Sequence, residues 1–171
     1  INQLEFKFAL VYKVDLPSID TQELTPVSVG HVTLIGGKTA KPFKTQIATL
    51  LQNINNYPEL QNVPEPQFGS PSQVSRPDGR ITLAVPITNQ SEFTQYVNTL
   101  CKIAGINNPD PNRFFHISVA NNQGGDPFKS IGDINVNDFS AKETTDQPQT
   151  TSTFSKLPTV GFISNYIGKL S

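Results

Sequence analysis

The sequence predicts a mixed α+β fold in a single domain of two lobes over residues 1–171. Apolar residues alternate with polar ones in the first segment, and two later segments have apolar residues at helical spacing. Each half of the chain combines a strand, a helix and a strand centred on a histidine. A chain of 171 residues is near the size of one ordinary domain and is long enough to bury a core.

The first half begins with a strand, expected over 4–14, in which every second residue is apolar: Leu4, Phe6, Phe8, Leu10, Tyr12 and Val14. Polar residues and prolines predict a loop over 15–29, and an apolar run over 29–35 predicts a short buried strand that ends at two glycines. Pro42 can begin a helix, and apolar residues at helical spacing follow it. An amphipathic helix is therefore expected over 42–54.

The second half begins with a proline-rich stretch over 57–79, in which Val63 and Phe68 can still pair at a sheet edge. The elements expected after it are a strand over 80–87, a helix over 90–104 capped by Thr88 or Asn89 and ended by Gly105, a linker over 106–112, a strand over 114–120 and a turn over 121–125. A Ser/Thr-rich composition predicts an exposed loop over 139–158, and the apolar segment 159–167 is expected to return to the body.

Charge and composition narrow the classes of partner. The net charge is −1, the pI is about 6.1 and the basic residues are scattered, which argues against a long nucleic-acid duplex as partner. No apolar run is long enough to cross a membrane and no signal peptide is evident, so a soluble, cytoplasmic protein is expected. Cys101 has no partner for a disulfide and lies in an apolar helical pattern, which predicts a small buried residue and favours a reducing compartment.

Two short segments share one pattern of residues: His31-Val32-Thr33-Leu34 and His116-Ile117-Ser118-Val119. In a strand, residues two positions apart point to the same face. Each histidine therefore projects together with a hydroxyl residue, while the apolar residues between them point into the core. Both pairs could line one cleft.

Such a cleft suits the cleavage of a phosphodiester. One imidazole can take a proton from the attacking oxygen and the other can give a proton to the leaving oxygen. The hydroxyls of Thr33 and Ser118 can hold the phosphate oxygens on which charge develops. The scheme needs no metal and no cofactor.

Two other interpretations compete with this one. Metal binding would need more ligands: His31 and His116 are the only histidines, no pair of cysteines exists, and few acidic residues lie near the two motifs. Alternatively, each histidine is an ordinary residue of a half-buried strand, and a single motif would favour that interpretation. The repetition of the motif around both histidines favours a functional pair.

The two His-x-Thr/Ser motifs with their apolar neighbours resemble those of the two-histidine (2H) phosphoesterase superfamily over about residues 4–135. The superfamily includes 2'-5' RNA ligase-like proteins, cyclic phosphodiesterases of tRNA splicing and phage anti-CBASS nucleases. The resemblance implies a bilobal α+β fold, with two antiparallel sheets flanked by helices around a central cleft. It also implies that His31 and His116 are the acid and base, that Thr33 and Ser118 hold phosphate, and that the protein is a metal-independent hydrolase.

The substrates that the resemblance implies are ribose-linked phosphodiesters, namely cyclic oligonucleotide signals, 2',3'-cyclic phosphates or 2'-5' linkages. A phage-type member would open a cyclic signal to evade immunity in an infected cell. Tyr12 is a candidate for stacking on a base and otherwise a core residue, and Arg113 is a candidate phosphate contact and otherwise solvated. The surface cations Lys38, Lys41 and Lys129 could add attraction for phosphate.

Two functions of other classes stay open. A nucleotide-binding module could sequester a cyclic nucleotide or a short RNA end without turnover. A structural or assembly role would draw on the Ser/Thr-rich tail, but it accounts for neither histidine motif.

Overall fold

The computed structural model describes residues 3–139. The chain divides into two units, Ile1–Val136 and Asn137–Ser171, and strands β1 to β7 and helices α1 to α3 lie in the first. The predicted loop over 139–158, apart from its first residue, and the apolar segment 159–167 lie outside the described residues. One domain over the full 171 residues remains a prediction.

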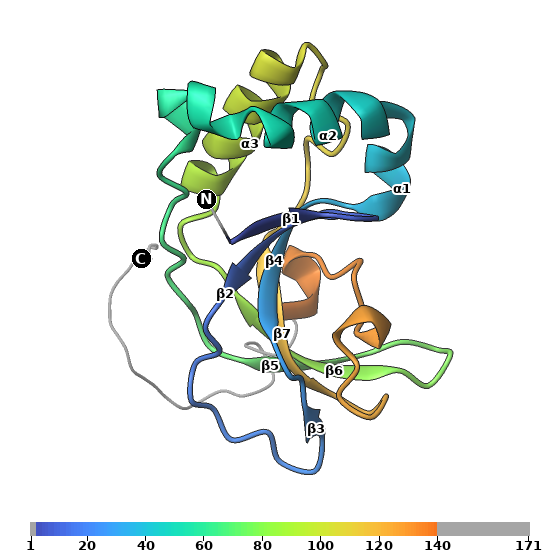
Figure 1. Ribbon diagram of the computed structural model, residues 1–171. Helices are drawn as coiled ribbons and strands as arrows, with labels where there is room; N and C mark the ends of the chain where they lie inside the picture. Colours follow the sequence, from blue (N-terminus) through green and yellow to red (C-terminus); the bar gives the residue numbers. More distant parts are fainter. Residues whose placement is uncertain (1–2, 140–171) are drawn as a thin grey trace. The chain divides into compact units, whose positions relative to one another are not determined.

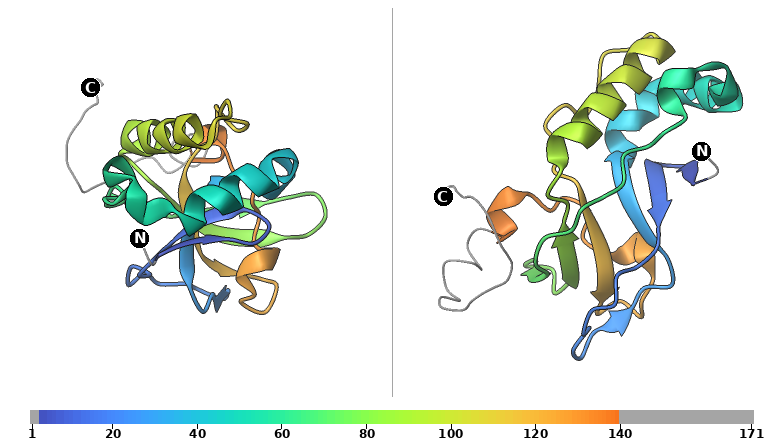
Figure 2. Two further views of the ribbon diagram at one scale, coloured as in Figure 1. Left: turned by 45° about the horizontal axis from the view of Figure 1, so that its top comes forward. Right: turned by 90° about the vertical axis from the view of Figure 1, so that its left-hand side faces the viewer.

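The fold is mixed α+β with two antiparallel sheets (Figure 1), which confirms these two parts of the predicted fold class. The first sheet has the order β1-β2-β4, with β1 at Leu4–Phe6, β2 at Leu10–Val14 and β4 at Gly30–Ile35. The second has the order β3-β7-β6-β5, with β3 at Thr25–Pro26, β7 at His116–Asn121, β6 at Ile81–Pro86 and β5 at Ser72–Ser75. The α-helices gather at one end of both sheets (Figure 2), with α1 at Gly37–Ala40, α2 at Lys44–Gln52 and α3 at Gln90–Ala104.

The single strand predicted over 4–14 is wrong, because this segment is a hairpin. Phe6 pairs with Leu10, and three residues make the turn between β1 and β2. Directly paired residues share one face of a sheet. A turn with an odd number of residues therefore lets apolar residues continue at every second position from β1 into β2, as they would in one strand. Phe8, at the turn, leaves the sheet pattern and its ring occupies the space beside Gly37, where a side chain would clash.

The helical segment begins earlier than the sequence predicts. Gly37, expected to end the strand, starts the short helix α1, and the 3-10 turn η1 at Lys41–Phe43, which contains Pro42, leads into α2. Two further 3-10 turns follow, η2 at Ile54–Asn56 and η3 at Pro58–Leu60. The proline is thus placed at the first turn of a helical piece, where its missing N–H costs no hydrogen bond.

The second half agrees more closely with expectation. β6 and α3 lie where they are predicted, whereas β7 begins two residues later than expected and includes Asn121, which was expected in the turn. Gly105 ends α3 in the left-handed conformation at φ 79°, and Phe68 forms an isolated bridge with Ile87. Asn89 stands at the N-cap of α3, but its side chain does not cap the helix. Its amide instead binds the backbone of Glu65 and Gln67, at 2.9 Å each, and fixes the proline-rich stretch.

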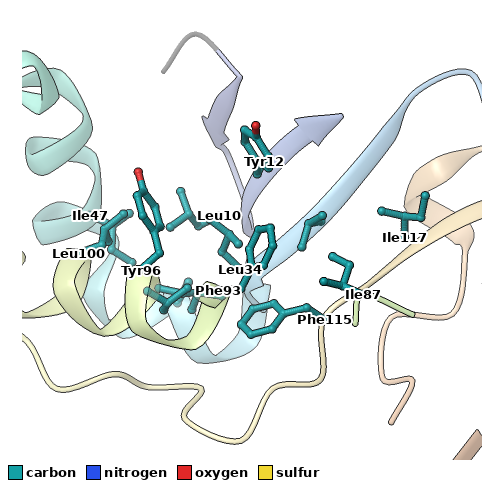
Figure 3. Packing of buried hydrophobic residues seen from close by; sticks show 14 of the residues in the cluster. Leu10, Tyr12, Leu34, Ile47, Ile87, Phe93, Tyr96, Leu100, Phe115 and Ile117 are labelled. Atoms are coloured by element: carbon teal, nitrogen blue, oxygen red, sulfur yellow. The ribbon is translucent and has the colours of Figure 1, made fainter. Parts of the chain in front are cut away.

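One hydrophobic core joins both sheets to the helices (Figure 3). Residues from β2, β4, β6 and β7 pack against Ile47 of α2 and against Phe93 and Leu100 of α3, all of which are fully buried. Cys101 is buried in the same core, as predicted, and its burial raises the pKa of the thiol to about 11. No helix within residues 3–139 is long and apolar enough to cross a membrane.

Candidate functional site

The two histidine motifs lie on neighbouring strands of different sheets. β4 forms one edge of the three-stranded sheet, and β7 lies inside the four-stranded sheet. Cα atoms of β4 come within 8 Å of Cα atoms of β7, and Figures 1 and 2 show the two strands side by side. The fold therefore brings together two segments that are far apart in the sequence.

Both histidines face away from the hydrophobic core. The core contains Val32 and Leu34 of β4 and Ile117 and Val119 of β7. Since neighbouring residues of a strand point to opposite faces, the residues of the two His-x-Thr/Ser motifs turn to the other side of their sheets. Four side chains share this orientation: His31, Thr33, His116 and Ser118.

Cross-strand partners support this assignment. Val11 pairs with Thr33, and Ala84 pairs with Ser118. Directly paired residues share a face, and both of these apolar partners lie outside the core cluster. The side of the sheets that carries the motifs is therefore distinct from the core side. We call this side the motif face.

His31 is half-buried and has charged neighbours on the motif face. Lys13 pairs directly with it, and the ammonium of Lys13 lies 3.5 Å from the carboxylate of Glu5. Partial burial lowers the pKa of His31 below its ordinary value, and the negative charge of Glu5 opposes part of that shift. The imidazole is therefore mainly neutral at pH 7, the form that accepts a proton.

His116 has a more enclosed setting, since only 7% of it is exposed. The residue before it, Phe115, is held through its backbone by Gln90 at the start of α3: the amide oxygen accepts from the Phe115 N–H at 2.9 Å, and the amide nitrogen donates to the Phe115 carbonyl at 2.7 Å. The same nitrogen donates to the carbonyl of Ile87 at 2.6 Å. Gln90 thus fixes the start of β7 against the end of β6.

The segment after β7 covers part of the motif face. Thr82, two residues before Ala84 on β6, accepts a hydrogen bond from the backbone N–H of Ile131 at 2.9 Å. Ile131 is 1% exposed but lies outside the core cluster, so it packs on the other side of the sheet from the core. The fully buried Asn121 organises the turn that starts this segment, through the backbone N–H groups of Gln123 and Gly125. This cover agrees with the low exposure of His116, whereas Ser118 stays partly exposed.

Arg113 ties the two motif strands together at one end. Its Nε donates to the carbonyl of Thr33 at 3.0 Å, Nη1 to the Asp110 carboxylate at 3.1 Å and Nη2 to the carbonyl of Gly132 at 3.2 Å. Asp110 also accepts from the backbone N–H of Gly36, which follows β4, at 3.0 Å. The guanidinium considered above as a phosphate contact is therefore committed to internal partners. Its position suits a role in holding the strands.

Tyr12 lies on the side of its sheet opposite to His31. It pairs with Val32, a core residue, and only 8% of it is exposed. A base bound between the two histidines would lie across the sheet from this ring. Three other side chains considered for phosphate attraction, Lys38, Lys41 and Lys129, are exposed on the surface.

Sequence reasoning did not select the polar residues that surround the motifs. Glu5 and Lys13 alternate with the apolar residues of the first segment, so their common face was visible in the sequence. Gln90 and Asp110 carry no such signal, because each acts on residues that are distant in the chain. Among the described residues, no group of three or more His, Cys, Asp or Glu side chains is arranged to hold a metal ion.

No family model matches the chain, and no match was found among the curated proteins or the solved structures.

Proposed function

We propose that the chain is a metal-independent phosphodiesterase of the two-histidine type, with the bilobal arrangement of that superfamily. Its substrates would be ribose-linked phosphodiesters: cyclic oligonucleotide signals, 2',3'-cyclic phosphates or 2'-5' linkages. The observation that carries the proposal is the common orientation of the motifs on neighbouring strands, with both histidines and both hydroxyls on the motif face.

The histidines take complementary parts in the reaction. His31, whose pKa is lowered by burial, accepts the proton of the attacking water. His116 donates a proton to the ribose oxygen that leaves phosphorus. One bond from water to phosphorus forms and one bond from phosphorus to ribose breaks, so the proton count balances. Thr33 and Ser118 donate hydrogen bonds to the phosphate oxygens that carry the developing charge.

The proposed substrate is a short nucleotide, in keeping with a net charge of −1. Cytoplasmic action, and action on an immune signal in an infected cell, belong to the same proposal. The first rests on the lack of a membrane-spanning run and of an evident signal peptide in the sequence. The second rests on the small size of the chain, the Asn/Gly-rich turn after the second motif and an aromatic residue in the first strand, which resemble features of phage-type members of the superfamily.

The test is a turnover screen in the presence of a chelator, over 2',3'-cyclic mononucleotides, 2'-5' oligoadenylate and cyclic dinucleotides. His31→Ala and His116→Ala are each expected to lower turnover by roughly 10² to 10⁴, the range for losing a general acid or base. Lys102→Ala, which removes an exposed cation in the last turn of α3, should leave turnover unchanged. Wild-type turnover in both folded histidine variants would reject the catalytic roles.

A second candidate, sequestration of a nucleotide without turnover, is favoured by the enclosure of His116, at 7% exposure. A proton-transfer group must reach its substrate, and enclosure restricts that reach. The same screen separates the two functions, because a sequestering protein would release its ligand intact after denaturation.

A further inference from the structure

A cavity of about 420 Å³ lies beside Tyr12, away from the two histidines. This volume is in the range of small-molecule sites. It is lined by Gln3, which precedes β1, by Tyr12 and Val14 of β2 and the chain that follows β2, and by residues of the proline-rich stretch such as Glu65 and Phe68. Tyr12 and Val14 project from the side of β2 opposite to Lys13, which pairs with His31. The cavity is therefore separate from the motif face.

The charge of the lining is negative. Asp15 and Glu65 contribute carboxylates, and no basic residue lines the cavity. Neither carboxylate takes part in an ion pair within residues 3–139, whereas Glu5, Asp78, Asp110 and Asp133, for example, each do. The rest of the lining consists of the amide of Gln3 and of apolar or aromatic side chains, among them Leu16, Pro17, Pro66 and Phe68.

The hydroxyl of Tyr12 adds a second, independent feature. Only 8% of Tyr12 is exposed, yet its hydroxyl makes no hydrogen bond to the part of the chain that the structure describes. Tyr96, which is 6% exposed, shows the usual arrangement, since its hydroxyl donates to the carbonyl of Leu60 at 2.8 Å. The Tyr12 hydroxyl has no such partner within residues 3–139 and is not itself enclosed, so it is open to a ligand in the cavity. Figure 3 shows the Tyr12 hydroxyl directed away from the packed cluster.

We propose that this cavity binds a small aliphatic ammonium ion, the chemistry of a polyamine. The carboxylates of Asp15 and Glu65 and the hydroxyl oxygen of Tyr12 would accept hydrogen bonds from the ammonium group. The prolines and Phe68 would cover the methylene chain. The proposal is independent of the phosphodiesterase activity.

Charge decides between this ligand and a nucleotide. A nucleotide could stack on Tyr12, but its phosphate would meet two carboxylates and no cation. An ammonium ion on a methylene chain matches both the charge and the apolar walls. The cavity is thus suited to an organic cation rather than to the substrate of the motif face.

The test uses 1,5-diaminopentane and spermidine as probes, with uncharged 1,5-pentanediol as the matched control, in calorimetric titration of the full chain. The amines are expected to bind and the diol is not. Asp15→Asn and Glu65→Gln should each weaken binding by about threefold, and both together by about tenfold, because ion pairs of exposed carboxylates are individually modest. Tyr12→Phe should weaken binding without a change of charge.

The matched charge control is Glu59→Gln, which removes a carboxylate that does not line the cavity. It should bind the amines as the wild type does. Equal binding by Glu59→Gln and by the double variant would show that the amines associate with acidic surface in general, and would overturn the proposal. Absence of amine binding, or binding of adenosine monophosphate in its place, would overturn it as well.

Discussion

The β4 and β7 motifs have the same residue pattern but different surroundings. β4 is an edge strand, and His31 is half-buried beside the charged side chains of Lys13 and Glu5. β7 has neighbours on both sides, and His116 is 7% exposed and follows a backbone fixed by Gln90. On the edge strand, the pKa of His31 responds to the charges beside it. On the central strand, His116 is part of a rigid framework. A repeated motif in the sequence therefore does not imply two equivalent sites.

The largest expected effect concerns Arg113, whose hydrogen bonds hold the two motif strands together. Arg113→Ala should lower the free energy of unfolding by about 3 kcal/mol, because it removes the charged partner of the Asp110 carboxylate and the guanidinium donor to two carbonyl groups. Arg80→Ala is the control, since Arg80 forms an exposed pair with Asp78 that should contribute about 1 kcal/mol or less. Urea denaturation of both variants measures the difference.

The milder Arg113→Lys variant tests the same tie by kinetics. If Arg113 positions the strands and does not bind phosphate, kcat should fall by about tenfold while KM changes little. A rise in KM with unchanged kcat would instead restore the role of a phosphate contact.

An intermediate effect is expected at the start of β7. Gln90→Ala should lower the free energy of unfolding by about 1 to 3 kcal/mol, since the Phe115 N–H loses its acceptor and the carbonyls of Phe115 and Ile87 each lose a donor. Gln95→Ala, on the exposed face of the same helix, should change it by less than about 0.5 kcal/mol. If the two substitutions have equal effects, β7 is not the more rigidly held of the two strands.

The smallest effect separates the electrostatics of the two histidines. Glu5 raises the pKa of His31 against the larger lowering by burial, so Glu5→Gln should lower this pKa further. A general base is inactive when it is protonated. The acidic limb of the kcat–pH profile should therefore follow the pKa of His31 to lower pH. Glu92→Gln, which changes an exposed residue of α3, should leave the limb in place. A shift to higher pH in Glu5→Gln would contradict His31 as the base.

Local patterns in the sequence predicted much of the fold. β4, β6 and α3 could be located because each has an apolar run or a helical repeat bounded by glycine or proline. β3 and β5 could not, since one has two residues and the other reads Ser-Gln-Val-Ser, with little apolar signal. The hairpin of β1 and β2 was hidden because Phe6 and Leu10 share a face across the turn.

The candidate site, like the fold, could be predicted from the sequence only in part. The alternation of residues along a strand predicted that each histidine shares a face with its hydroxyl residue. The bond from Arg113 to Thr33 joins residues that are 80 positions apart, so no local pattern could reveal it. The enclosure of His116 likewise depends on a segment that packs back onto the sheet after β7.

The borders of the four-stranded sheet have a consequence for the behaviour of the protein in concentrated solution. β3, at one border, is only Thr25–Pro26, and β5, at the other, is four residues long with Pro71 before it and Pro77 shortly after it. Proline has no N–H to offer an incoming strand, and short borders give little template for one. These short, proline-flanked edges therefore disfavour the growth of fibrils by strand addition to this sheet. The same prolines made its outer strands difficult to predict from the sequence.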